Sequence, residues 1–366
     1  MGRFLTLVTG RGVRRDLYAM CQRAGTVVTW KARPMSLLPA TPVVHVLHEN
    51  PDWFGPFQAA FEAAGVPYRE WLLVDGVLDL DEAPPAGIFW SRISASAHTR
   101  GHGLSKDYTR SVLNWLEAYG ARTVNGRRTI ELEVSKVDQL TRLRAQGFDV
   151  PRTRVVVGTH RLAEAAADFP TPFITKHNQG GKGLGVQKFD SAAELAAAIA
   201  AGEYAEPEDG ISLLQEFVVS AHAEVTRVEI VGDEFIYAIT ADTARGGYQL
   251  CPADACAIDP TTGALLLPPG ATIMPEAGQQ IFALREGFEH PIVDRYRDFL
   301  RTEGIEIAGI EFIETADGRV VTYDVNTNTN YNAEIEAVAP RSGPGAIVAY
   351  LAGVLAASYP QVGARP

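Results

Sequence analysis

Residues 172–185 read PFITKHNQGGKGLG, an apolar strand that ends in a lysine and runs into a glycine-rich turn. The turn contains four glycines and a second lysine: Gly180, Gly181, Gly183, Gly185 and Lys182. Glycine lets main-chain N–H groups turn toward an anion, and lysine supplies a point charge for phosphate oxygens. No Lys-Ser or Lys-Thr pair follows at P-loop spacing. Taken alone, the stretch predicts either a phosphate-binding loop or a simple hairpin tip.

Stretches on both sides of this turn carry further residues suited to a nucleotide. Upstream, Ser135 and Lys136 open a predicted helix, which places another lysine at a helix start. Downstream, Leu213–Val218 is an apolar strand that carries a Gln-Glu pair, and Arg227 lies on the strand predicted after it. The order of these residues indicates one site built from distant parts of the chain.

The last third of the chain predicts a metal site. Ile307–Ile313 and Val320–Val325 are predicted to pair as a hairpin across an Asp-Gly turn. Glu311 lies on the first strand, and Asp324 and Asn326 lie on the second, so their oxygen atoms can converge. Mg²⁺ that bridges phosphates prefers such hard oxygen ligands and takes only one or two carboxylates.

In this order, the chain carries two lysines, a glycine-rich loop, a Gln-Glu strand and a Glu…Asp-x-Asn pair. This series of motifs resembles the ATP-grasp superfamily of carboxylate–amine ligases. Within that superfamily, the chain looks most like the glutathione-synthetase-like branch that includes the ribosomal-protein glutamate ligase. The stretches that carry this second resemblance are Trp90–Ser96, Leu116–Gly120, Thr123–Asn125 and Pro151–Thr153. The resemblance covers residues 43–358, and residues 1–42 are predicted to be an addition.

The resemblance implies roles for individual residues around the nucleotide. Lys136 and Lys176 would contact the phosphates of ATP, and the four glycines with Lys182 would form the lid over them. Glu224 would hold the ribose hydroxyls, with an uncertainty of about one residue in its spacing. The adenine hinge would be formed by Gln215, Glu216, Phe217 and Val218. The Mg²⁺ ligands, for two ions that Mn²⁺ could replace, would be Glu311, Asp324 and Asn326.

The chain departs from the family pattern at two places. The family usually has Glu-x-Asn on the second metal strand, whereas this chain has Asp324 there, a carboxylate shorter by one methylene. The family often places an arginine directly after the strand that contains Tyr237, whereas here several residues precede Arg245. Arg245 and Arg227 are the predicted catalytic cations for the acyl intermediate, and the substrates are expected to differ from those of known relatives.

Three residues are predicted to contact the substrate. Arg92 follows the short apolar strand Gly87–Trp90, and open α/β sheets bind ligands at the carboxyl ends of their strands. Its guanidinium suits a carboxylate, although an exposed salt bridge is the alternative interpretation. Asn328 and Asn330 alternate with Thr residues in a stretch too polar for a packed strand, which favours a loop that presents amides to a substrate.

Strands and helices alternate from residue 43 to residue 119, which indicates a parallel sheet with helical crossovers. Predicted strands at 213–218, 226–231 and 234–240 are typical of an antiparallel sheet instead. With the resemblance, the expected fold class is α/β with α+β parts, an ATP-grasp fold. The expected divisions are an N-terminal extension (1–42), a parallel α/β domain (43–128), a lid subdomain (129–212) and a subdomain with the metal site (213–366), the last two enclosing ATP.

Composition excludes several classes of protein. The 366 residues are 46% hydrophobic and 21% charged, which is ordinary for a globular protein and unlike a disordered chain or a fibre. The net charge of −11 and the lack of a long basic run argue against nucleic acid or an anionic membrane as a partner. No stretch reaches the ~18 apolar residues of a membrane helix. The apolar C-terminal helix predicted at Ala346–Ala357 could pack internally or against a second copy in a homo-oligomer.

Three cysteines allow no disulfide framework, and the basic residues Arg11, Arg14 and Arg15 follow the first apolar run instead of preceding it as in a signal peptide. We therefore expect a cytoplasmic protein. Cys251 and Cys256 lack further soft ligands at zinc spacing and are interpreted as incidental. His98 and His102 lie in a polar loop that is either solvated or binds a carboxylate.

These observations predict an ATP-dependent ligase that joins a small carboxylate to an amine, such as an amino acid or a short peptide. ATP would convert the carboxylate into an acyl phosphate, the amine would attack it, and the products would be an amide or peptide bond, ADP and phosphate. Two alternatives stay open from the sequence: an ATP-binding sensor or scaffold without ligation, and a kinase that uses the same nucleotide site on a hydroxyl acceptor.

Overall fold

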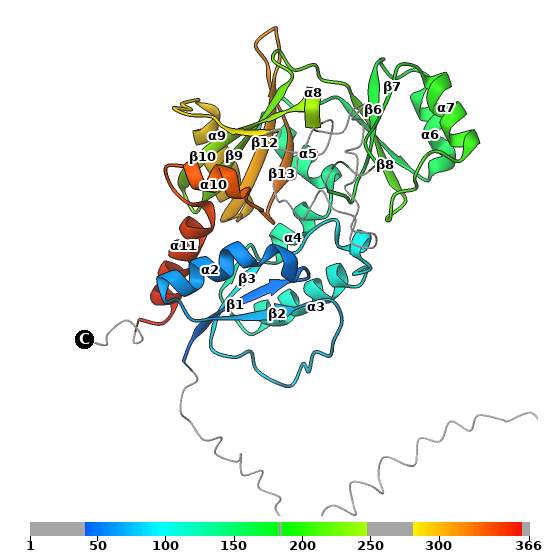
Figure 1. Ribbon diagram of the computed structural model, residues 1–366. Helices are drawn as coiled ribbons and strands as arrows, with labels where there is room; N and C mark the ends of the chain where they lie inside the picture. The colour runs from blue at the N-terminus through cyan, green and yellow to red at the C-terminus, as the bar shows by residue number, and fades with distance from the viewer. Residues whose placement is uncertain (1–40, 182, 184, 247–280, 361–366) are drawn as a thin grey trace, which may run out of the picture. The chain divides into compact units, whose positions relative to one another are not determined.

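The computed structural model describes residues 41–181, 183, 185–246 and 281–360, and these residues form three sheets with helices around them (Figure 1). Residues 1–40 of the predicted N-terminal extension and all three cysteines lie outside the described residues.

The first sheet is parallel, as the alternation of strands and helices predicts. Its order is β2-β1-β3-β4. The strands are β1 (Val43–His48), β2 (Tyr68–Leu72), β3 (Gly87–Ser91) and β4 (Thr123–Val124). Successive side chains point to opposite faces of a strand. In β3, therefore, Ile88 and Trp90 belong to one hydrophobic core, while Phe89 belongs to the core on the other face.

Helices cover both faces of this sheet. The short helix η1 (Pro51–Trp53), α2 (Gly55–Ala64) and α11 (Gly343–Ser358) adjoin the face with Trp90, and α3 (Ser105–Ala118) covers the other. The C-terminal helix packs internally: Ile347 and Leu351 are fully buried in the same core as Phe57 and Phe61 of α2. This contact settles the position of that helix, which the sequence left open.

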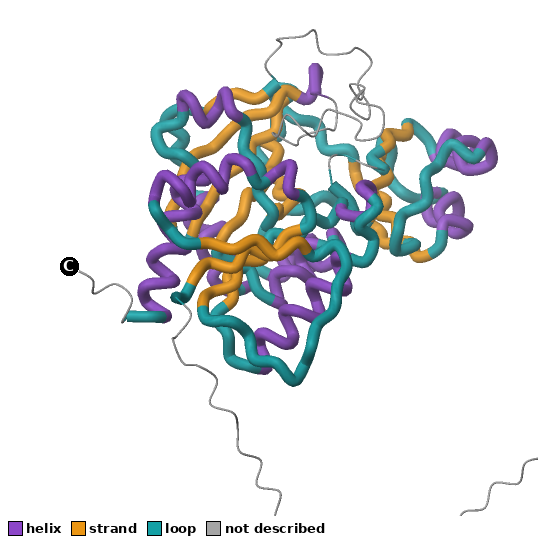
Figure 2. The backbone as a smooth tube through the Cα atoms, turned by 60° about the horizontal axis from the view of Figure 1, so that its bottom comes forward, coloured by secondary structure: helices purple, strands orange, loops and turns teal. Residues whose placement is uncertain are grey.

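The second sheet is antiparallel and has the order β5-β8-β6-β7. Its strands are β5 (Thr153–Val157), β6 (Phe173–His177), β7 (Gln187–Phe189) and β8 (Ile211–Glu216). Helices η3 (Thr159–Arg161), α6 (Leu162–Ala166) and α7 (Ala192–Ala201) accompany it, and α6 and α7 lie on one face at the right of Figures 1 and 2. The glycine-rich loop joins β6 to β7.

The third sheet is also antiparallel and has the order β11-β10-β9-β12-β13. Its strands are β9 (Glu224–Val231), β10 (Glu234–Asp242), β11 (Phe282–Leu284), β12 (Ile307–Glu314) and β13 (Val320–Asn326). The helices after these strands are α8 (Thr243–Gly246), α9 (Ile292–Glu303) and α10 (Ala333–Val338). Phe299 and Tyr296 of α9 are fully buried against the sheet.

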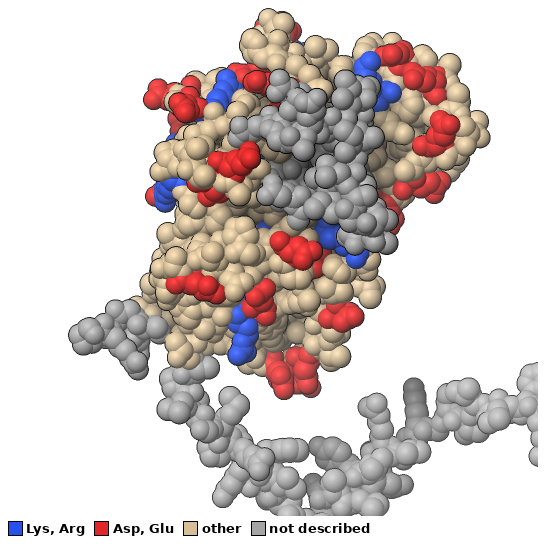
Figure 3. Space-filling view, in the orientation of Figure 1, with Lys and Arg blue, Asp and Glu red and all other residues tan. Residues whose placement is uncertain are grey.

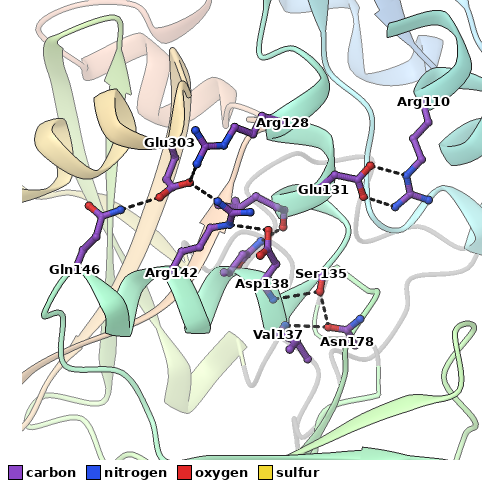
Figure 4. Close-up of polar contacts among 12 residues, drawn as sticks. Arg110, Arg128, Glu131, Ser135, Val137, Asp138, Arg142, Gln146, Asn178 and Glu303 are labelled. Atoms are coloured by element: carbon purple, nitrogen blue, oxygen red, sulfur yellow. Dashed lines mark hydrogen bonds and ion pairs between the residues drawn. The ribbon is translucent and has the colours of Figure 1, made fainter. Parts of the chain in front are cut away.

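Two helices connect the first sheet to the second: α4 (Arg127–Glu133), which the sequence did not predict, and α5 (Lys136–Ala145). Glu303 at the end of α9 fixes both of them (Figure 4). Its carboxylate accepts hydrogen bonds from Arg128 of α4 at 3.1 Å, from Arg142 of α5 at 2.6 Å and from Gln146 at 2.8 Å. The C-terminal end of α5 is thereby held against the end of α9.

The proposed division at 212 and 213 falls inside β8, which pairs with both β5 and β6. The divisions therefore stay a proposal. On the face shown in Figure 3, Asp and Glu side chains cover more of the described surface than Lys and Arg side chains do, in keeping with the negative net charge. Among the described helices, none combines the length and the hydropathy needed to span a membrane.

Asn125, in the loop between β4 and α4, joins the first sheet to the third. Its backbone has φ of 50°, and its side-chain oxygen accepts hydrogen bonds from the N–H groups of Glu306 (3.0 Å) and Ile307 (3.1 Å). Its amide group donates to the carbonyl oxygens of Ile307 (2.8 Å) and Thr327 (3.2 Å). Asparagine tolerates this left-handed backbone better than most residues.

We expect Asn125→Ala to lower the free energy of unfolding by about 3 kcal/mol, because several buried main-chain groups lose their partner. Chemical denaturation measures this change. Asn114→Ala, on the exposed face of α3, is the matched control and should change the free energy by less than about 0.5 kcal/mol. Equal unfolding free energies for the two variants would contradict the role of Asn125.

Candidate active site

A cavity of about 410 Å³ is lined by residues from the second and third sheets, from α5 and from the loop after β3. The residues singled out from the sequence that line it are Lys136, Lys176, Gly180, Gly181, Gly183, Gln215, Glu216, Phe217, Val218, Arg227, Glu311, Asp324, Asn326, Asn328 and Asn330. Arg92, Gly185 and Glu224 do not line it. Lys182 and the side chain of Arg245 lie outside the described residues.

The two lysines reach the cavity because Asn178 fastens their elements together (Figure 4). Lys136 is the first residue of α5, capped by Ser135, and Lys176 lies near the end of β6. The side-chain oxygen of Asn178, two residues after Lys176, accepts hydrogen bonds from Ser135 Oγ at 3.1 Å and from the N–H of Val137 at 2.9 Å. The carbonyl oxygen of Asn178 accepts one from the N–H of Lys136 at 3.1 Å.

The glycine-rich loop needs its glycines for two different reasons. Gly180, Gly181 and Gly183 line the cavity, where the absence of side chains leaves main-chain N–H groups accessible. Gly185 has φ of 70°, and a Cβ atom there would overlap the ring of His177. Gly185 therefore serves the packing of the loop against β6.

Both lysines face carboxylates of the third sheet. Lys136 is 4% exposed and forms an ion pair with Asp324. Burial tends to raise the pKa of Asp324, but Lys136 and Lys176 outweigh it and hold that pKa below its usual value. Burial lowers the pKa of Lys176 to about 8, against the opposing effect of Asp324.

Glu311 and Asp324 are directly opposite each other on β12 and β13. Burial, followed by the charge of Asp324, raises the pKa of Glu311. Its carboxylate accepts hydrogen bonds from the hydroxyl of Tyr323 at 2.8 Å and from the amide of Asn326 at 3.1 Å. Because Asn326 turns its NH₂ group to Glu311, its oxygen is left to face a cation.

These residues fit Mg²⁺ that is also bound by phosphates. Within the described residues, no group of three or more His, Cys, Asp or Glu side chains is arranged to hold a metal ion by itself. Two carboxylates and an amide oxygen are nevertheless sufficient when phosphate oxygens and water complete the shell of Mg²⁺. The donor set therefore suits a metal that arrives with a nucleotide.

The predicted hinge begins with the last two residues of β8, Gln215 and Glu216, and is bonded to the start of β5. The N–H of Glu216 donates to the carbonyl of Arg152 at 2.9 Å, and the N–H of Arg152 donates back to the Glu216 carboxylate at 3.0 Å. Gln215 donates to Thr153 Oγ1 at 3.1 Å. The cavity beside the hinge has apolar walls, formed by Ile174, Val186, Val225 and Ile313. A flat apolar base fits such walls.

Arg227 lies between two buried carboxylates, Glu229 on its own strand and Glu311 on β12. Burial alone would lower the pKa of Arg227, but these two charges raise it above its ordinary value. One terminal nitrogen, Nη2, is buried without a hydrogen-bond partner among the described residues. Arg227 lines the cavity, while its Nη2 atom lies on the side of Gly309.

Arg92 lies at the carboxyl end of β3, as the sequence predicts, but its side chain does not line the cavity. β3 ends at Ser91, and the guanidinium of Arg92 turns into the core, 4.3 Å from the ring of Phe57. Its side chain is 2% exposed and donates to the Thr329 carbonyl and to Asn330 Oδ1, both at 3.2 Å. Burial lowers the pKa of Arg92 to about 10. The surface salt bridge is excluded, and Arg92 reaches the cavity only through Asn330.

Glu224 is exposed at the start of β9, where its main-chain groups bond to Ser220. Ser220 and Ala223 line the cavity in its place. Glu224 thus lies between two residues that line the cavity, Ala223 and Val225, and points to the other side of the strand.

Several cavity residues escaped the sequence analysis. Glu133 of α4 is buried, and its carboxylate accepts two hydrogen bonds of 2.8 Å from Thr327. Nothing local marks Glu133, because its partner lies 194 residues away. Trp53, Ser94 and Ser96 form the wall near the first sheet.

Behind that wall, Glu49 holds the polar loop. It is 1% exposed and accepts hydrogen bonds from Arg100 at 2.5 Å and from His102 at 2.9 Å. Arg100 also donates to Ser96 Oγ at 3.2 Å, and the short helix η2 (Ala97–Arg100) forms between them. Arg100 and His102 are therefore tied to Glu49, so the solvated-loop interpretation does not hold for them.

Comparison with known proteins agrees with this geometry. No family model matches the chain. A "Probable alpha-L-glutamate ligase" of Xanthomonas euvesicatoria pv. vesicatoria (strain 85-10) is 30% identical over 149 residues, which is 39% of this chain and 48% of that protein. The chain thus spans about half the length of this relative. A protein of the same name from Xanthomonas oryzae pv. oryzae (strain MAFF 311018) is 26% identical over 251 residues, 67% of this chain and 73% of that one.

Solved structures are similar over most of the chain. The RimK domain protein ATP-grasp from Sphaerobacter thermophilus DSM 20745 has a TM-score of 0.56 at 16% identity, covering 84% of this chain and 99% of that one. D-cycloserine synthetase DcsG has a TM-score of 0.57 at 16% identity, covering 85% and 99%. ATP-grasp ligase PsnB, complexed with a phosphomimetic variant of minimal precursor, Mg and ADP, has 0.56 at 16%, covering 85% and 98%.

The chain therefore has the ATP-grasp fold, as the order of its motifs predicts. The relatives by sequence carry the name alpha-L-glutamate ligase, and the similar solved structures are named as ATP-grasp proteins or as a synthetase.

The lowered pKa of Lys176 predicts that nucleotide binding takes up a proton at alkaline pH. Phosphate oxygens favour the charged amine, so bound nucleotide should raise that pKa. Below about pH 8 the Lys176 amine is charged in both the free and the nucleotide-bound protein. Above about pH 8 the free protein must gain a proton when it binds the nucleotide, so the affinity for nucleotide falls as the pH rises. Titration calorimetry with AMP-PNP, in buffers of different ionisation enthalpy at about pH 7 and about pH 9, measures the uptake.

Lys176→Arg is the matched control, because a guanidinium stays charged throughout this range. We expect this variant to bind AMP-PNP without the additional proton. Equal proton uptake by the wild type and the variant would assign the effect to another group.

Proposed function

We propose that this chain is an ATP-dependent carboxylate–amine ligase that forms an amide or peptide bond and releases ADP and phosphate. The observation that carries the proposal is the convergence of two lysines, two carboxylates and a glycine-rich loop on one cavity. The names of its relatives support the same class of reaction.

The reaction needs activation because a carboxylate is a poor electrophile at neutral pH. Transfer of the γ-phosphoryl group of ATP to the carboxylate gives an acyl phosphate and ADP, and attack by an amine then expels phosphate. Lys136, Lys176 and bound Mg²⁺ would neutralise charge on the transferring group, and Arg227, which lines the cavity, would add a further positive charge. We assign Arg245 to the same task from the sequence pattern alone.

For the nucleotide, we propose that ATP places its phosphates between the glycine-rich loop and the two lysines and its base against the hinge. Mg²⁺ would be held by Glu311, Asp324 and Asn326 and would supply charge neutralisation for phosphoryl transfer. We further propose two ions, which Mn²⁺ could replace. The ribose would lie near Ser220 and Ala223.

For the carboxylate substrate, we propose the side of the cavity formed by Asn328, Asn330 and Ser94. Arg92 can only donate hydrogen bonds, so Asn330 must turn its oxygen to Arg92 and its NH₂ group elsewhere. This orientation makes Asn330 a donor in the cavity wall, which suits a carboxylate oxygen. The charge of Arg92 behind it adds to the attraction.

The test is a screen for ADP and phosphate release with pairs of amino acids and short peptides, with products identified by mass spectrometry. L-glutamate is the first amine to try, given the names of the relatives. A product that contains both reactants supports ligation, whereas a stable phosphorylated product indicates a kinase. Lys136→Ala should abolish release in every active pair. Nucleotide binding with no turnover in any pair would favour the sensor.

Asn330→Asp should raise the KM for the carboxylate substrate by about one to two orders of magnitude, because a donor becomes a charged acceptor. The KM for ATP should stay within about twofold, since the nucleotide residues lie on other elements. Steady-state kinetics with each substrate varied in turn measures both. Asn332→Asp is the control: Asn332 caps α10, a position that aspartate fills equally well. An equal effect of both substitutions would contradict the assignment.

A further inference from the structure

Glu229 is a buried carboxylate that the proposed reaction does not use. It lies in the middle of β9, two residues after Arg227 and therefore on the same face of the strand. Its side chain is 2% exposed and does not line the cavity. Burial raises the pKa of Glu229, against the opposing effect of Arg227. Since burying a charge is costly, its position calls for a physical reason.

The contacts of Glu229 centre on Arg227. Arg227 Nε lies 2.6 Å from Glu229 Oε1, whereas Arg227 Nη1 lies 3.5 Å from Glu311 Oε1. The second oxygen of Glu229 accepts a 3.5 Å hydrogen bond from the hydroxyl of Tyr331. The arginine is thus bound to the inner carboxylate and only approaches the outer one.

The neighbouring strand is shaped to permit this arrangement. Gly309 on β12 is directly opposite Glu229, and Glu311 is directly opposite Arg227. A Cβ atom at Gly309 would lie 2.5 Å from both Nε and Nη2 of Arg227. The guanidinium therefore occupies the space that a side chain at 309 would fill, beside Glu229.

A freely moving Arg227 would compete with a metal ion for Glu311. Both are cations, and a bidentate arginine–carboxylate pair would occupy the oxygens that Mg²⁺ needs. We propose that Glu229 is a positioning residue that holds Arg227 back from Glu311 and so leaves Glu311 available to Mg²⁺. The inference rests on the metal site of the proposed function. On this proposal, the affinity for Mg²⁺ depends on Glu229, a buried carboxylate that does not itself bind the ion.

Metal affinity in variants of Glu229 distinguishes a positioning residue from one that only stabilises the fold. In Glu229→Gln, the side chain keeps its size but loses its charge, so Arg227 should move onto Glu311 and the metal should bind about tenfold to a hundredfold more weakly. In the double variant Glu229→Gln/Arg227→Met, no cation competes, so metal affinity should return to within about threefold of the wild type. A residue that merely stabilises the fold would give no such rescue.

The experiment is a titration with Mn²⁺ followed by electron paramagnetic resonance, on the full chain with AMP-PNP present. Glu303→Gln is the matched control: Glu303 is also buried and bound by two arginines, Arg128 and Arg142 (Figure 4), but it does not line the cavity. This variant should lose stability in thermal unfolding and keep its Mn²⁺ affinity. Glu229→Asp, which restores the charge, should bind Mn²⁺ nearly as the wild type does.

If Glu229→Gln does not fold, Gly309→Ala tests the same point with Glu229 intact. Its added methyl group displaces the guanidinium, and Mn²⁺ affinity should fall about tenfold. Unchanged affinity in Glu229→Gln, or a double variant as weak as the single one, would overturn the inference while leaving the ligase proposal intact. A wild type that binds no Mn²⁺ would overturn the proposed metal site and the inference together.

Discussion

The ion pair between Lys136 and Asp324 connects the two halves of the candidate site. It joins the first residue of α5 to the strand that carries Asp324 and Asn326; the Lys136 side chain is buried and that of Asp324 is mostly buried. Neither charge could stay there alone, because an isolated charge in a low-dielectric cavity is strongly unfavourable. The pair therefore requires that α5, β12 and β13 keep their relative positions. Asn178 and Glu303 secure α5 from either end.

Around this pair, the cavity combines opposite charges that only partly compensate one another. Lys176, Glu311 and Arg227 add one cation, one anion and another cation, and Glu229 supplies a further anion behind them. A triphosphate with Mg²⁺ brings both kinds of charge, so it can replace these internal pairings by new ones. Charged groups held in place in this way would stabilise a transferring phosphoryl group by positioning and electrostatics, as phosphoryl transfer generally requires.

The proposed substrate side is built differently, from neutral groups that bond to the side chains of Arg92 and Arg100. Arg92 orients Asn330, and Glu49 orients Arg100, which in turn donates to Ser96. Neither Arg92 nor Glu49 lines the cavity itself. A wall of fixed amides and hydroxyls discriminates by geometry, since a wrong substrate leaves buried polar groups unpaired.

The sequence by itself determined the ATP-grasp fold and the parallel first sheet, and it singled out residues that the structure brings to one cavity. These follow from local patterns: a strand ending in lysine, glycines in the next turn, and paired Glu and Asp strands. Only the tertiary structure decided where Arg92 points, which residues Glu133 and Glu229 contact, and where the C-terminal helix packs. Those features depend on partners far away in the chain. A side chain's direction in a core is set by packing, which no local pattern encodes.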